Sequence, residues 1–467
     1  MLDTDDTGSE AAAGFSWRRW LMLGLVALPL VLWWVSWYPG MLSVSSIDQL
    51  TAVDAGEFGT GVPAIYSIFV WLVTRVWSSP AAVTLVQVVA MVALLDAFVR
   101  RGTALGIPRW LAGGTAVLFA WLPAVGVTTI ALEVQVAQTL VGIWLLVELM
   151  ALAPGPGEYL SDPWSQARFG GALALAWLLD HAGFVVVALI AGAVVVGLRR
   201  RAELWIVPFA GAAALALLVQ GPVYALFSVD REVGPIGLAY APEIAAVYHH
   251  DPGWFDESDE ALLEAVADLE VWDDAYRCGD GSALITDREF DAGTIRSRPG
   301  VYRGLLARAA ATHPLTVLGH RVCAAGFLFV PGQPLGVQFR TYVYNVPPND
   351  LGIHRATLWE QGFRLTKAVL VRVDQPGRLW LFWRPAVLVW PALAGVVVLF
   401  VRRRGVSWPG VALVAYVLLA FLTVREPSFP EAFSVHSLAF LSLPFWWPAV
   451  ARSGAVDEAR NASSGGE

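Results

Sequence analysis

Four carboxylates in two short polar segments are the residues of this chain best suited to act as a base. Asp48, Asp54 and Glu57 follow the first apolar segment, and Glu133 lies between two later ones. Transfer of a group to a hydroxyl needs a base to take the proton and cations to hold an anionic leaving group. We predict Asp48 as that base, with Glu133 second. Aspartate also caps helix starts, so Asp48 has that alternative role, and Glu133 has the alternative of an interfacial surface residue.

The cations that could hold a leaving group also lie outside the apolar runs. Arg75 follows an apolar stretch, Arg425 lies near the end of the chain, and further arginines are spread over residues 296–384. A guanidinium suits this role because it donates paired hydrogen bonds to phosphate oxygens. The predicted substrate-binding residues are Asp54, Glu57, Arg75, Gln135, Asp180, His181, Arg425 and His436.

Asp180 and His181 interrupt a long apolar stretch from Phe169 to Leu198. The chain on both sides of this stretch has cytoplasmic character, so the sequence predicts a hairpin of two short helices with Asp180 to Gly183 at its turn. Short helices would hold the pair below the membrane surface. An ionisable residue there costs free energy and usually serves a function.

Adjacent histidines at His249 and His250, followed by Asp251, raise the question of a metal ion. Neighbouring side chains point apart on any regular element, and no third ligand is spaced suitably from them. We therefore predict no metal site.

The composition indicates what positions these residues. Apolar residues make up 57% of the chain and charged residues 15%, and 22 residues are tryptophan. A soluble domain does not have this composition. The sequence predicts an all-α polytopic membrane protein with interfacial helices and an external α-rich domain. We predict about ten spans of roughly 20 residues, near 20–37, 81–100, 109–126, 135–152, 166–180, 183–198, 204–226, 384–401, 408–424 and 434–451.

Arginine clusters in short loops predict the orientation, because basic residues near span ends resist translocation. The protein should lie in the cell membrane with both termini in the cytoplasm. The first span should be retained, since Met1 to Ser16 lacks the basic start of a cleaved signal. Val62 to Trp77 should lie at the external interface, because its crossing would place an arginine pair outside. The clusters are Arg18-Arg19, Arg100-Arg101, Arg199-Arg200-Arg201 and Arg402-Arg403-Arg404.

A long insertion divides the chain into an N-terminal seven-span module at 1–226, an extracytoplasmic domain at 227–383, and a three-span module with a cytoplasmic tail at 384–467. The first half of the insertion is acidic and predicts a capped amphipathic helix from Ser258. The apolar side of that helix should hold Leu262, Leu263, Val266 and Leu269.

The second half of the insertion mixes arginines with aromatic residues and contains an apolar helix candidate from His313 to Pro331. This mixture suits packing on the outer leaflet, either to bind an anionic headgroup or to anchor the domain. Cys278 and Cys323 both lie in the insertion. They can pair if their Cα atoms come within about 7 Å, which the sequence leaves open.

The order of these parts resembles that of bacterial GT-C glycosyltransferases, membrane enzymes that use polyprenyl-phosphate sugars and include mannosyltransferases. The likeness covers most of the chain. It implies a polyprenyl-phosphate sugar donor, no separate cofactor, membrane lipid as surroundings, a glycan, lipid or protein acceptor, and no nucleic acid. The motifs that carry it are Tyr38-Pro39-Gly40, Pro63 to Ser67, Thr74 to Trp77, Gly106 to Trp110, Leu122 to Gly126, Asp180 to Gly183 and His313-Pro314.

Several polar positions differ from what similar sequences carry. The first loop has Ser45-Ser46 where an aspartate-serine pair is usual, and Val134-Gln135 stands where a lysine-aspartate pair is usual. Two alternatives stay open: a scaffold that has lost catalysis, and a flippase or transporter for a lipid-linked substrate. Transporters usually show two related halves, which this chain lacks. The other departures are Gly61-Val62-Pro63 for Trp-His-Pro, Asp180 to Gly183 for Arg-His-Asn-Gly, and Glu431 to Phe433 with His436 for an arginine-tyrosine pair.

Overall fold

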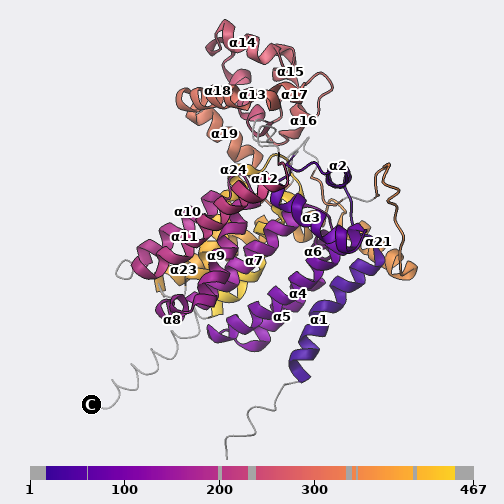
Figure 1. The fold of residues 1–467 in the computed structure, drawn as a ribbon, viewed down its shortest axis with the longest axis vertical. Helices are drawn as coiled ribbons and strands as arrows, with labels where there is room; N and C mark the ends of the chain where they lie inside the picture. The colour runs from indigo at the N-terminus through magenta and orange to yellow at the C-terminus, as the bar shows by residue number, and fades with distance from the viewer. Residues whose placement is uncertain are drawn as a thin grey trace, which may run out of the picture.

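The computed structural model describes residues 17–59, 62–197, 202–229, 238–332, 339–342, 345–402 and 407–447. Within these ranges the regular structure is helical, and extended pairing is limited to two isolated bridges, Met41 with Ala131 and Arg340 with Ser428. The predicted all-α fold is therefore confirmed. Figure 1 shows a block of long helices that carries a smaller lobe, α13 to α19, at one end.

The helical block is formed by both ends of the chain. From the N-terminal part come α1 (Trp17–Ser36), α2 (Val44–Ala55), α3 (Ala64–Val76), α4 (Pro80–Ala104), α5 (Arg109–Trp121), α6 (Pro123–Thr129), α7 (Val134–Leu152), α8 (Pro156–Ser161), α9 (Pro163–Leu178), α10 (Phe184–Gly197), α11 (Ala202–Leu218) and α12 (Tyr224–Leu226). From the C-terminal part come α23 (Ala386–Arg402), α24 (Trp408–Thr423) and α25 (Phe429–Ser442).

Fewer helices than predicted are long enough to cross a membrane unaided. Within the described ranges, five have the required length and apolar composition, and the bent pair α5 and α6, which meet at 67°, would make a sixth. The helices α9 and α24 have 16 residues each, which at 1.5 Å per residue reach about 24 Å. The prediction of ten spans included apolar residues beyond the ends of such helices.

The predicted hairpin of short helices is confirmed. Helices α9 and α10 are joined by residues 179–183, and Asp180 and His181 lie in the connection. Gly183 allows the close turn, because a Cβ there would lie 2.0 Å from the carbonyl oxygen of Ala176. The predicted interfacial segment is the 13-residue apolar helix α3; its position relative to a membrane stays a prediction.

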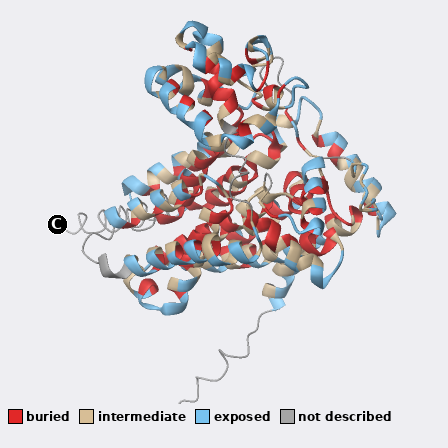
Figure 2. Cartoon of the chain, turned by 45° about the horizontal axis from the view of Figure 1, so that its top comes forward, coloured by how far each residue is buried: buried red, intermediate tan, exposed pale blue. Residues whose placement is uncertain are grey.

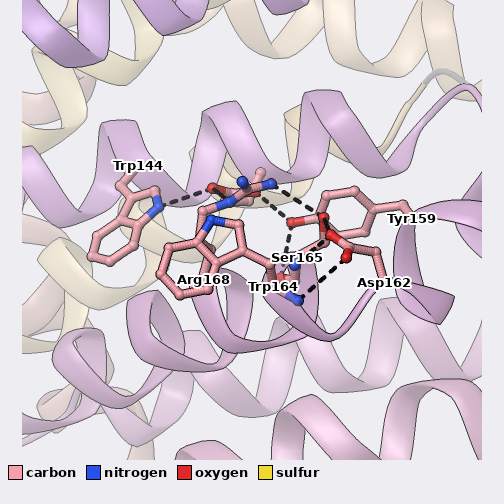
Figure 3. Close-up of polar contacts among 7 residues, drawn as sticks. Trp144, Tyr159, Asp162, Trp164, Ser165 and Arg168 are labelled. Atoms are coloured by element: carbon pink, nitrogen blue, oxygen red, sulfur yellow. Dashed lines mark hydrogen bonds and ion pairs between the residues drawn. The ribbon is translucent and has the colours of Figure 1, made fainter.

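A polar network fixes α8 and α9 to α7. Buried Glu148 of α7 accepts hydrogen bonds from Trp144 Nε1, at 3.0 Å, and from the Tyr159 hydroxyl, and it pairs with Arg168 of α9 at 3.3 Å. Figure 3 shows Arg168 beside Ser165, which accepts from the guanidinium at 3.1 Å. The carboxylate of Glu148 thus joins residues of three helices, which indicates a structural role for this cluster.

We expect Glu148→Ala to destabilise the protein, because it leaves several buried donors without an acceptor at roughly 1–3 kcal/mol each. The thermal unfolding midpoint in detergent should fall clearly. Glu158→Ala is the matched control, because Glu158 is exposed on α8. Equal midpoints for both variants would contradict a structural role for the network.

The insertion is divided between two cores instead of forming one domain. Figure 2 shows buried residues both inside the helical block and inside the lobe. The lobe encloses its own core, which includes Ile244, Trp272 and Tyr302, whereas Phe339 and Trp383 from the second half join the core of the block. The helices of the insertion are α13 (Ala241–His250), α14 (Glu257–Glu264), α15 (Leu269–Asp274), α16 (Ser282–Ile285), α17 (Ala292–Ser297), α18 (Pro299–Thr312), α19 (Pro314–Ala324), α20 (Gly326–Phe329), α21 (Glu360–Val373) and α22 (Leu379–Phe382).

Two predicted helices of the insertion differ in their bounds. The acidic helix is capped by Asp256, whose side chain accepts from two backbone N–H groups, and it ends before Leu269. The apolar helix predicted from His313 to Pro331 is interrupted at Ala325. The pairing left open by the sequence is settled: Cys278 and Cys323 form a disulfide with Cα atoms 5.7 Å apart.

Candidate active site

Two ends of the helical block can be told apart by their charges. Buried Asp96, in the second half of α4, pairs with Arg19 at the start of α1 (2.9 Å) and with Arg100 (3.0 Å). The lobe lies at the other end of the block (Figure 1). The predicted arginine clusters at residues 199–201 and 403–404 lie outside the described residues.

A cavity of about 390 Å³ opens at the end of the block that carries the lobe. Its wall combines the start of α7, the turn between α9 and α10, the end of α24 and the start of α25. Its lining contains apolar residues, among them Phe184, Val185 and Leu419, together with many polar ones. The polar residues are Gln135, Gln138, Asp180, His181, Tyr240, Arg321, Thr423, Arg425, Glu431 and Ser434.

Two carboxylates of the cavity are held by glutamines on α7. Gln138 donates to Asp180 at 3.1 Å, and the backbone N–H of Ala182 donates to the other oxygen of Asp180 at 2.8 Å. Asp180 therefore has both oxygens engaged in the turn. Gln135 donates to Oε1 of Glu431 at 3.2 Å, and among the described residues no hydrogen bond is seen to its second oxygen.

Two arginines share this cavity, and only one of them forms an ion pair among the described residues. Arg321 forms a buried ion pair with Glu243 of α13. Burial, together with the nearby charge of Arg425, lowers the pKa of Arg321 to about 10. Within the described residues the guanidinium of half-buried Arg425 has no hydrogen bond or ion pair. Its charge nevertheless acts on Asp180 and Glu431, which line the same cavity.

Glu133 lies beside the cavity and is held by the first loop. Ser46 donates to the carbonyl of Leu132 at 2.8 Å, and Met41 pairs with Ala131, so the two loops lie together. Burial raises the pKa of Glu133, an effect that a hydrogen bond from Ser43 opposes. Glu133 is half-buried in this position.

The carboxylates of α2 lie away from this cavity. Asp48 is exposed, because the buried face of α2 is formed by neighbours such as Ser46, Ile47 and Gln49. Glu57 is exposed just after the helix ends at Gly56. Among the described residues Asp48 makes no polar contact, so the structure gives our first choice of base no partner and no cavity.

Two other predicted residues line a separate cavity of about 310 Å³, together with α3 and the start of α4. Asp54 and Arg75 both face it, and the Arg75 guanidinium lies 5.2 Å from the centre of the Trp71 ring. His436 is buried in α25 against Phe429 and lines neither of these cavities. In the described part of the chain no group of three or more His, Cys, Asp or Glu side chains could hold a metal ion.

The structure adds site residues that the sequence did not identify. Glu431 could have been found by the criterion used for Glu133, a carboxylate at the edge of an apolar run. Gln138 lies one helical turn after Gln135, further inside the apolar run of α7. Tyr240 and Arg321 come from the insertion, and no local pattern in the sequence relates them to α7 or α25.

No family model matches this chain, and no curated protein matches it. Two solved structures do: ArnT from Cupriavidus metallidurans in the apo state and the same protein bound to undecaprenyl phosphate. Each has 15% sequence identity and a TM-score of 0.34, and covers 93% of this chain and 78% of that chain. With similarity at this level, the residue roles below rest on the geometry of this chain.

Proposed function

We propose that this membrane protein transfers a sugar from a polyprenyl-phosphate donor to a hydroxyl of an acceptor. The observation that carries the proposal is one cavity that combines apolar residues, the Arg425 guanidinium and the Glu431 carboxylate, of which Gln135 binds one oxygen. The apolar lining residues can contact a lipid chain, and the Arg425 guanidinium can bind the phosphate of that lipid. The sequence resemblance to GT-C glycosyltransferases supports the same activity.

In this proposal Glu431 is the base, in place of Asp48. The acceptor oxygen attacks the anomeric carbon of the donor while its proton passes to Glu431. The bond between that carbon and the phosphate oxygen breaks, and the polyprenyl phosphate leaves with the electron pair. Arg425 holds the developing negative charge, and Arg321, already neutralised by Glu243, adds hydrogen-bond donors.

The proposed face is the extracytoplasmic one. The arginines of α1 and α4 lie at the opposite end of the block from the lobe, and basic residues stay on the cytoplasmic side. The cavity and the lobe would then face outwards. The positions of both termini in the cytoplasm belong to the same proposal.

The test is a turnover assay. Purified protein in liposomes is offered a radiolabelled polyprenyl-phosphate hexose together with a lipid extract as the source of acceptor. Release of polyprenyl phosphate with label on an acceptor supports the proposal. Movement of the intact donor across the bilayer without transfer would indicate a flippase. Absence of both transfer and movement would indicate a scaffold. Each of these two outcomes would overturn the proposal.

A further inference from the structure

The lobe supplies part of the cavity, although it has a core of its own. Tyr240, just before α13, and Arg321 of α19 both line the cavity beside residues of α7, α24 and α25. The polar wall is therefore incomplete without the lobe. This arrangement raises the question of what holds the lobe in register with the membrane helices.

The segment between α24 and α25 is the place where the lobe and the helical block are joined. The backbone N–H of Gly281 donates to the carbonyl oxygen of Arg425 at 2.9 Å. The Arg321 guanidinium donates to the carbonyl of the preceding residue, Val424, at 3.1 Å. Two separate parts of the lobe thus bind the backbone at Arg425 and at the residue before it.

The second half of the insertion binds the same segment from its other end. The N–H of Arg340 donates to the carbonyl of Pro427 at 3.0 Å, and Phe429 N–H donates to the carbonyl of Arg340 at 2.8 Å. The Arg340 side chain also pairs with Glu426. The backbone of residues 424–429 is therefore held by hydrogen bonds from the insertion at both of its ends.

The contact at Gly281 depends on the lack of a side chain. A Cβ at this position would lie 3.0 Å from the Arg425 carbonyl oxygen and 3.0 Å from Cγ of Pro242. The backbone angles of Gly281, φ −63° and ψ −16°, suit any residue. Close approach to the Arg425 segment is thus the specific reason for a glycine here.

The disulfide connects the two contacts covalently. Cys278 lies three residues before Gly281, and Cys323 lies two residues after Arg321. It joins the turn that binds the Arg425 carbonyl to the helix that binds the Val424 carbonyl. Without this bond the two contacts would depend on separate parts of the lobe staying together.

We propose that Gly281 and the Cys278–Cys323 disulfide are positioning elements that set the place of Arg425 in the cavity and thereby the affinity for a lipid phosphate. The inference rests on the proposed function for its ligand. The positioning of residues 424–429 by the lobe does not rest on that function, because it concerns how firmly this segment is held in the protein without ligand.

The test compares Gly281→Ala with Gly300→Ala, a glycine of the same lobe with open space around the added methyl. Hydrogen exchange is measured by mass spectrometry in the full-length protein without ligand, for the amide of residue 281, which donates to the Arg425 carbonyl, and for residues 424–429. We expect faster exchange in Gly281→Ala, in Cys278→Ser with Cys323→Ser, and in reduced wild type, and no change in Gly300→Ala. Reoxidation of the wild type should restore the slow exchange.

A second measurement addresses the ligand. The dissociation constant for polyprenyl phosphate should rise about tenfold in Gly281→Ala, which corresponds to about 1.4 kcal/mol. Exchange and affinity equal to those of Gly300→Ala would overturn the inference. A wild type that binds no polyprenyl phosphate would refute the proposed function, and the exchange comparison would still decide the positioning.

Discussion

Glu431→Gln is expected to lower the rate of sugar transfer by about 10² to 10⁴, the usual contribution of a positioned general base. The substitution keeps the size of the side chain and an oxygen that can accept the hydrogen bond from Gln135, which spans 3.2 Å in the native protein. Folding and donor binding should therefore change little. Single-turnover rates measured at saturating donor would isolate the chemical step from binding.

Two parallel substitutions identify the base. Asp48→Asn should leave transfer near the native rate, because Asp48 is exposed on α2 and outside the cavity. Glu133→Gln should have a smaller effect than Glu431→Gln, because Glu133 lies beside the cavity and is bound by Ser43. A native rate in Glu431→Gln together with a lost rate in Glu133→Gln would transfer the base to the second loop.

Several parts of the fold could be predicted because they depend on local patterns. The hairpin follows from a polar interruption, Asp180 to Gly183, in a long apolar stretch. The number of spans could not be predicted, because hydropathy does not show where a helix ends or bends within an apolar run. At Trp121 and Pro123, for example, one apolar run becomes two helices that meet at 67°.

The candidate site could be predicted in part. Gln135, Asp180, His181 and Arg425 do line one cavity, since each lies where an apolar run ends and such ends gather on one side of a membrane protein. Asp48 satisfied the same criterion, but its side chain lies on the exposed face of α2. Which face of a helix is buried depends on packing against other segments, here the loop around Leu132.

Arg425→Ala is expected to weaken binding of polyprenyl phosphate by about 10- to 150-fold, because a hydrogen bond to a charged group contributes roughly 1.5–3 kcal/mol. The Arg425 side chain forms no hydrogen bond or ion pair among the described residues. Its removal therefore leaves no described group with a broken ion pair, and stability should change little. Titration of the purified variant with polyprenyl phosphate, and the donor KM of the transfer reaction, measure the effect.

Arg75→Ala provides the matched comparison, because Arg75 faces the other cavity with Asp54. That arginine is exposed and lies over the Trp71 ring, so its loss should leave the affinity for polyprenyl phosphate close to native. If Arg75→Ala weakens binding while Arg425→Ala does not, the donor phosphate binds between α3 and α4. Glu431 lines the other cavity. In that case the base and the phosphate-binding residue would both belong to the cavity that holds Asp54 and Arg75.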